Sequence, residues 1–224
     1  MKYLAVESFE DLNNVLSVID TADARIFGRL EAYTFKSTGE DKKLRNHIEN
    51  KYDQAKQPPP APPPAFRNLE SPHTRKTFFY LLATLNAAYP DYDFSDIQPD
   101  YFDRVPSLSV AVNTVGATLL NLLGDSKGTQ ELGERIWDAI DEVTDLANCQ
   151  IYSFHPDPEI EPDAGFDEEG NVSRNLAAPF YFFFVNTKMK RLSFFTARAV
   201  NNIVSRWNLD QDGRVIDDES EDAV

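Results

Sequence analysis

A run of prolines in the first third of the chain limits the fold more than any other feature. Six of the seven residues from 58 to 64 are proline, in the stretch PPPAPPPA. Because proline fixes φ and has no backbone N–H, this stretch favours a stiff polyproline II conformation over a helix or a central strand. We therefore expect residues 45–71 to form a Pro-rich linker, with a ligand for a PxxP-reading domain as the alternative.

The block before the linker, residues 1–44, contains one predicted helix and up to two predicted strands. VESFEDLNNVLSVID places its apolar residues on one helical face, and we expect Ser8 to be the N-cap. ARIFGRLEAYTFK, residues 24–36, is rich in aromatic and aliphatic residues and alternates as a strand does. Gly28 would mark a bulge in this strand.

The block after the linker, residues 72–208, contains three predicted helices and three predicted strands. SPHTRKTFFYLLATLNAAY has Ser71 as its expected N-cap and Pro72 at the first helical position. VPSLSVAVNTVGATLLNLLG would end at Gly124, and GTQELGERIWDAIDEVTDLA would be capped by Thr129. CQIYSFH indicates a strand, and PFYFFFVN and RLSFFTARAV indicate a hairpin around TKMK.

Neither block offers enough strands to complete a sheet alone. The sequence therefore predicts an α+β fold in which residues 1–44 and 72–208 form a single domain. We expect a mostly antiparallel sheet of four to five strands, packed with about four helices and interrupted by a disordered or extended linker.

The acidity of the chain is concentrated in two segments. The net charge is −15, while residues 157–169 carry seven acids without a base, and residues 209–224 carry seven acids with one arginine. Outside these segments acids and bases nearly balance, so we expect no direct sequence-specific nucleic-acid binding. An acidic tail suits a basic protein surface, and its candidate contact residues are Asp217, Asp218, Glu219, Glu221 and Asp222. The alternative is a solvated tail that maintains solubility.

The stretch AAYPDYDFSDIQPDYF, residues 87–102, alternates aspartates with aromatic residues. It does not fit a calcium loop, because a loop starting at Asp91 would have Asp96 at the sixth position, where glycine is required. We expect the aromatic residues to pin the loop to the core while the aspartates face water. The alternative is a carboxylate-based hydrolase or small-ligand-binding protein that uses Asp91 and Asp93.

Other chemistry finds little support in the sequence. Two of the three histidines lie in or beside the predicted linker, and the nucleophile-elbow, P-loop and dinucleotide-binding motifs are missing, so we predict no catalytic residue, cofactor or metal. Cys149 is the only cysteine, which indicates a reducing compartment. No apolar run is long enough to cross a membrane, and the N-terminal segment turns acidic too early for a secretory signal.

Four segments, in this order, resemble the eukaryotic Maf-type repressors of RNA polymerase III. They are GRLEAYTFKSTGEDKKL, RKTFFYLLATLNAAYPDYDFS, IWDAIDEVTDLANCQIYSFHPD and FYFFFVNTKMKRLSFF. The likeness covers nearly the whole chain outside the linker and tail. One departure is the linker, which is short and proline-rich and lacks the long serine-rich stretch and basic kinase sites of many members.

The resemblance implies a regulator, not an enzyme, that binds RNA polymerase III and blocks its recruitment by the TFIIB-related factor of TFIIIB. It also implies control by kinases and a phosphatase, including TOR signalling, and shuttling between nucleus and cytoplasm. Ser71 is the candidate phosphorylation site, with the N-cap role as the alternative. Lys188, Lys190 and Arg191 match a nuclear-localisation cluster, with ordinary turn lysines as the alternative, and Arg75 with Lys76 forms a weaker basic pair. We expect a monomer.

Overall fold

The computed structural model describes residues 1–21, 24–53, 66, 69, 71–157, 159–162 and 176–201. The helices are α1 (Glu7–Leu16), α2 (Gly39–Asp53), α3 (Pro72–Ala88), α4 (Leu108–Leu123) and α5 (Lys127–Thr144), with short 3-10 turns η2 (Pro99–Tyr101) and η3 (Leu146–Asn148). The strands are β1 (Lys2–Tyr3), β2 (Ile19–Asp20), β3 (Ala24–Thr34), β4 (Phe102–Val105), β5 (Gln150–Phe154), β6 (Leu176–Asn186) and β7 (Arg191–Asn201). No helix among these residues has the length and apolar character needed to cross a membrane.

One antiparallel sheet joins the two sequence blocks. Its strand order is β1-β3-β7-β6-β5-β4, and β2 also pairs with β3. The decisive pairing lies between β3 of the first block and β7 of the second, which match residue for residue from Ala24↔Asn201 to Thr34↔Arg191. The predicted α+β class and single domain are thus confirmed. The sheet formed by the described residues has seven strands instead of the predicted four to five, because the sequence analysis did not foresee the short strands β1, β2 and β4.

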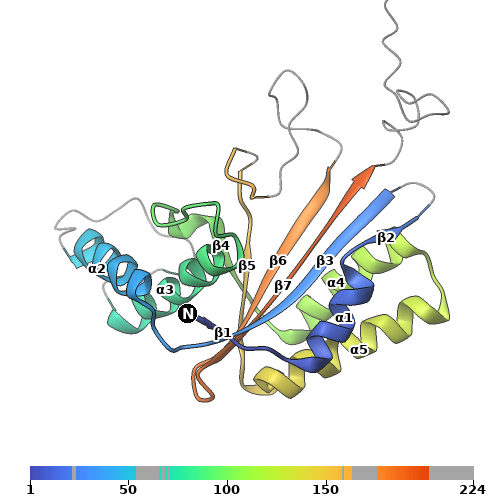
Figure 1. Cartoon of the computed structure of the whole chain (residues 1–224), viewed down its shortest axis with the longest axis horizontal. Coiled ribbons are helices and arrows are strands. Elements are labelled where there is room, and N and C mark those ends of the chain that lie inside the picture. The colour runs from blue at the N-terminus through green and yellow to red at the C-terminus, as the bar shows by residue number, and fades with distance from the viewer. Residues whose placement is uncertain are drawn as a thin grey trace, which may run out of the picture.

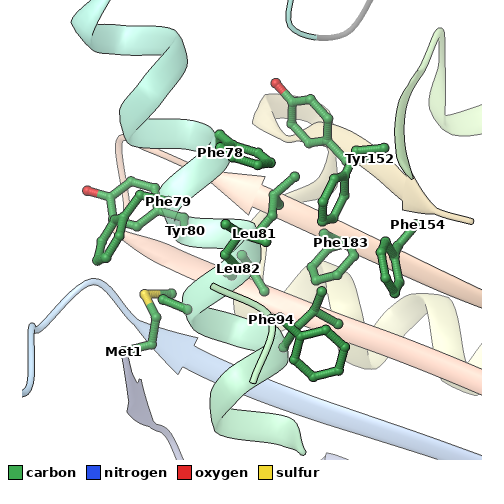
Figure 2. Packing of buried hydrophobic residues seen from close by; sticks show 14 of the residues in the cluster. Met1, Phe78, Phe79, Tyr80, Leu81, Leu82, Phe94, Tyr152, Phe154 and Phe183 are labelled. Carbon is green, nitrogen blue, oxygen red and sulfur yellow. The ribbon is translucent and has the colours of Figure 1, made fainter. Parts of the chain in front are cut away.

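Helices cover both faces of this sheet (Figure 1). α1, α4 and α5 lie on one face, and α2 and α3 lie on the other. Along β6, Phe182 and Phe184 pack with the first set of helices, whereas Phe183 packs with α3 on the opposite face. Figure 2 shows Phe183 between Leu81 of α3 and Phe154 of β5. Side chains alternate across a strand, so an unbroken aromatic run supplies both halves of the core.

Gly28 serves close packing and forms no bulge. The register of β3 against β7 runs through Gly28 without a shift, which corrects the expected irregularity. A Cβ placed on Gly28 would lie 3.3 Å from the Cβ of Leu16, the last residue of α1. The missing side chain therefore lets α1 approach the sheet closely.

Two of the four expected helix caps differ from prediction. α1 begins at Glu7 with Val6 as its N-cap, so Ser8 lies inside the helix. α5 is capped by Ser126, whose side chain accepts a hydrogen bond from the backbone N–H of Thr129. In both helices the prediction chose a polar residue that lies two or three positions after the residue with the extended N-cap backbone. Ser71 and Gly124 occupy the predicted cap positions.

The predicted linker begins too early. Residues 45–53 continue α2, in which Leu44 and Ile48 are buried against α3, so the linker cannot start at residue 45. Phe66 and Leu69, also assigned to the linker, are buried in the same cluster. The proline run and the acidic tail of residues 209–224 lie outside the described residues.

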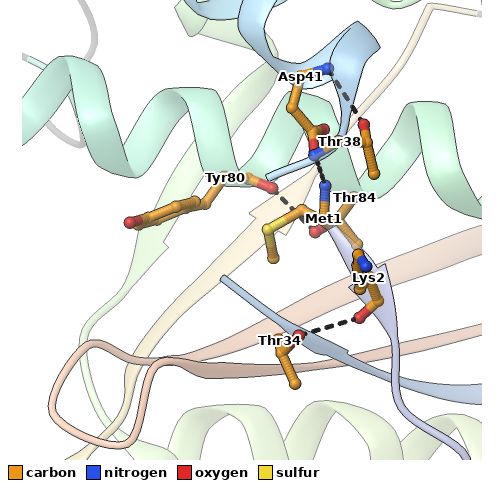
Figure 3. Close-up of polar contacts among 7 residues, drawn as sticks. All are labelled: Met1, Lys2, Thr34, Thr38, Asp41, Tyr80 and Thr84. Atoms are coloured by element: carbon orange, nitrogen blue, oxygen red, sulfur yellow. Dashed lines mark hydrogen bonds and ion pairs between the residues drawn. The ribbon is translucent and has the colours of Figure 1, made fainter. Parts of the chain in front are cut away.

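The N-terminal end of the chain is fastened to α2 (Figure 3). The Met1 ammonium pairs with the Asp41 carboxylate, and both groups are buried. Burial alone would raise the pKa of Asp41, but hydrogen bonds from the ammonium and from Thr38 outweigh it and lower that pKa below its ordinary value of 3.8. The pair holds β1 and α2 together at the edge of the core.

Asp41→Asn should reduce the free energy of unfolding by about 3 kcal/mol near neutral pH, because it leaves a buried ammonium without its partner. A carboxylate with a lowered folded pKa stabilises the protein above its unfolded pKa, and this contribution fades as pH falls through the lower folded value. The difference between the two proteins should therefore be constant above about pH 5 and shrink below about pH 4. Urea titrations over this pH range measure it.

The matched control is Glu40→Gln, an acid-to-amide change at the exposed neighbouring position, where Glu40 bonds only Lys43. It should change the free energy of unfolding by less than about 0.5 kcal/mol. Both variants must begin at Met1 with a free amine. Equal effects of the two substitutions would contradict the role given to Asp41.

Candidate functional site

The aspartate-rich loop is pinned to the core by its aromatic residues. Tyr89 and Phe94 are buried, and the Phe94 backbone N–H donates to the Asn86 side chain at 2.8 Å. Asp91 and Asp93 are exposed, as expected. Tyr92 differs from expectation, since 44% of it is exposed and its ring packs on Phe94 from outside. The loop is a structural turn.

Asp93 of this loop lacks the electrostatics of a general acid. Hydrogen bonds from Ser95 lower the pKa of Asp93, whereas a general acid needs a raised one. Burial raises the pKa of Glu31, but this carboxylate lies beside Arg29 and accepts a 2.8 Å hydrogen bond from Tyr33. The hydrolase alternative required a raised pKa in this loop, whereas the pKa of Asp93 is lowered.

The described residues provide no metal-binding group of three or more His, Cys, Asp or Glu side chains. Burial raises the pKa of the Cys149 thiol to about 11, and its Sγ donates to the backbone carbonyl of Thr144. A thiol of this kind is a packing residue, because nucleophilic cysteines require a lowered pKa.

Ser71 stands at the start of α3, where its backbone is extended and Pro72 follows at the first helical position. Ser71 therefore occupies the predicted N-cap position, but its side chain makes no capping hydrogen bond. Its carbonyl accepts from the Arg75 N–H, and the Arg75 guanidinium contacts Glu49 at 2.7 Å. Ser71 is thus one turn from a buried arginine that links α3 to α2.

The β6–β7 turn, residues 187–190, divides the predicted nuclear-localisation cluster between two sites. Lys188 donates to the Asn148 side chain of η3 at 3.1 Å, and Arg191 donates to the Val143 carbonyl at the end of α5 at 3.2 Å. Lys190 lies on the other side of the turn and lines a pocket with α2 and α3. The import role of the three residues stays a prediction.

This pocket is basic. Its basic side chains are Arg45 of α2, His73 and Lys76 of α3, and Lys190 of the turn, and we call it the basic pocket. It has a volume of about 400 Å³, and the buried Tyr80 also lines it. The weak basic pair predicted at residues 75 and 76 is therefore split, because Arg75 turns inward to Glu49 while Lys76 enters the basic pocket.

Sequence reasoning missed Arg45, because residues 45–71 were assigned to the linker. A signal was present in GEDKKLRNHIENKYD, where Leu44, Ile48 and Tyr52 recur every four residues. This is the spacing of one helical face. His73 was noted only as a residue beside the linker. The tail residues Asp217, Asp218, Glu219, Glu221 and Asp222 lie outside the described residues, and their partner-binding role stays a prediction.

The arrangement of sheet and helices is that of a known structure. A crystal structure of citrus MAF1 matches with a TM-score of 0.62 and 28% identity, covering 87% of this chain and 99% of that one. This similarity defines the class of protein as one with the MAF1 fold.

Sequence comparison then gives the family. The model of the Maf1 regulator family matches residues 26–196, and the chain belongs to this family. It is 36% identical to the repressor of RNA polymerase III transcription maf1 of Schizosaccharomyces pombe, over 93% of this chain and 87% of that protein. It is 26% identical to the repressor of RNA polymerase III transcription of Dictyostelium discoideum, over 91% and 86%. The predicted family is confirmed.

Proposed function

We propose that this chain represses transcription by RNA polymerase III by binding the polymerase and blocking its recruitment by the TFIIB-related factor of TFIIIB. The observation that carries the proposal is membership of the Maf1 regulator family across residues 26–196. Relatives aligned over most of the chain are named repressors of this transcription. Repression by occupancy needs only a stable surface, and a sheet covered on both faces provides one.

Phosphorylation at Ser71 would act on the contact between Arg75 of α3 and Glu49 of α2. A phosphate adds nearly two negative charges at the start of α3, where the helix dipole favours them. Arg75 lies one turn further along and is shared between Glu49 and the Leu69 carbonyl. We propose that the phosphate competes with Glu49 for Arg75 and so loosens α2 from α3. We also propose that the protein moves between nucleus and cytoplasm under kinase and phosphatase control.

The purified chain should bind RNA polymerase III and prevent the TFIIB-related factor from binding the same polymerase, because both require one surface. A pull-down on immobilised polymerase at low salt, with increasing TFIIB-related factor, measures the competition. Each protein should displace the other. A ternary complex that retains both at saturation would contradict occlusion, and no retention of the chain would contradict the proposed function itself.

Removal of residues 209–224 should weaken binding to the polymerase and flatten its salt dependence, because the tail carries seven acids. Affinities of the full and truncated chains across a salt series measure this. The matched variant keeps the length of the tail and replaces its acids by Asn and Gln, and it should behave like the truncation. An unchanged affinity and salt slope in both variants would reject a role for the tail in binding.

A further inference from the structure

The basic pocket concentrates positive charge in a chain of net charge −15. Its lining contains four basic side chains and no carboxylate. Within the described residues, Arg45, Lys76 and Lys190 form no ion pair, whereas the nearby Lys43 and Lys51 each contact an acid. Like charges repel, so a site that gathers them without counter-charges is suited to an anion from outside.

Aromatic rings position two of these cations without neutralising them. The Arg45 guanidinium lies 4.7 Å from the centre of the Phe79 ring, and the Lys76 ammonium lies 5.9 Å from that of Tyr80. Tyr80 is itself held by Phe35, whose stacked ring is 3.8 Å away. Cation–π contacts of this kind fix the direction of a basic side chain and leave its N–H groups able to donate.

Lys190 occupies a strained position. Its φ is 55°, in the left-handed region that glycine adopts with less strain than any other residue. Its carbonyl accepts a hydrogen bond from the Phe35 N–H at 3.0 Å, which ties the turn to the segment after β3. From this fixed turn the Lys190 side chain lines the basic pocket.

We propose that the basic pocket binds the phosphate group of a phosphorylated serine or threonine on a partner protein. A phosphate monoester is a compact dianion with three acceptor oxygens, which matches the guanidinium fork of Arg45 and the ammonium groups of Lys76 and Lys190. Ser37 and Thr187 also line the pocket and add hydroxyl donors. Clustered basic side chains of this kind are the usual receptors for phosphorylated segments.

The exposure of the basic pocket favours a protein-borne phosphate over a small molecule. Arg45, His73, Lys76 and Lys190 are all exposed, so the pocket is open, whereas small-molecule sites bury most of their ligand. A nucleic acid is disfavoured, because the basic side chains form a cluster and not a stripe that could follow an extended polyanion. This inference goes beyond the proposed function and can be tested without the polymerase.

The test is fluorescence anisotropy with the full chain at fixed ionic strength. The probe is a short, labelled, otherwise neutral peptide with one central phosphoserine. It should bind at least about tenfold more tightly than the same peptide with serine or aspartate at that position. Lys190→Gly removes a cation and relieves the left-handed strain, so this variant should fold normally and lose about tenfold in affinity.

The matched control is Lys188→Gln, which removes a charge from the same turn but from the η3 side. It should bind the phosphopeptide as the unaltered chain does. An equal loss in Lys188→Gln and Lys190→Gly would overturn the proposal, because it would show a general charge effect. Equal affinity for the phosphoserine and aspartate peptides would also overturn it.

Two competitors separate the other sources of phosphate. Inorganic phosphate should displace the peptide only at concentrations at least about tenfold above the Kd of the peptide. If inorganic phosphate competes as well as the peptide does, the site holds a free ion and the proposal is wrong. Single-stranded RNA that binds more tightly than the peptide, and loses this binding in Lys190→Gly, would likewise overturn it.

Discussion

Burial of the β6–β7 hairpin on both faces is the constraint on which the rest of the structure depends. Phe183 of β6 and Phe194 of β7 are paired across the hairpin, with ring centres 4.8 Å apart, and face α3. Phe182 and Phe195 form the neighbouring pair and face α1, α4 and α5. Each fully buried phenylalanine stabilises the fold by about 1.5–3 kcal/mol relative to an exposed one. Loss of either set of helices would expose such residues and would therefore strongly lower the free energy of unfolding.

The hairpin also explains how a chain divided by prolines forms one domain. β3 lies along β7 for eleven residues, and so the block before the proline run completes the sheet of the block after it. α1 then packs on one face, and α2 packs with α3 on the other. Phe66 and Leu69, between α2 and α3 in sequence, are buried in the same cluster as these two helices.

Periodicity and composition were sufficient to predict the central elements. Long runs such as PFYFFFVN and RLSFFTARAV are rich in residues that favour strands. The pairing between these two runs was predictable because they are neighbours in sequence and form a hairpin. The pairing of β3 with β7 joins residues far apart in sequence. One sequence alone does not show which residues of these two strands lie opposite each other. The two-residue strands β1 and β2 are too short to show the alternation of a strand. Helix α2 was assigned in part to the linker because most of its residues are polar.

The candidate site illustrates the same limit. Lys190 and Lys76 were recognised as basic residues in separate segments, but nothing in sequence places them in one pocket. Arg45 joins them only because α2 packs beside α3, and Gly28 acquires a role only because α1 approaches β3. Packing between distant segments therefore creates the basic pocket, while local sequence determines the elements that carry it.

Native-state hydrogen exchange tests the central role of the hairpin most directly. Amides of residues 181–186 and 192–197 should exchange only through global unfolding, with opening free energies equal to the unfolding free energy from urea titration. Amides of α2 and α4 should open at lower free energies. If the hairpin amides exchange through smaller openings than those of α3 or α5, the hairpin does not hold the two faces together and this account is wrong.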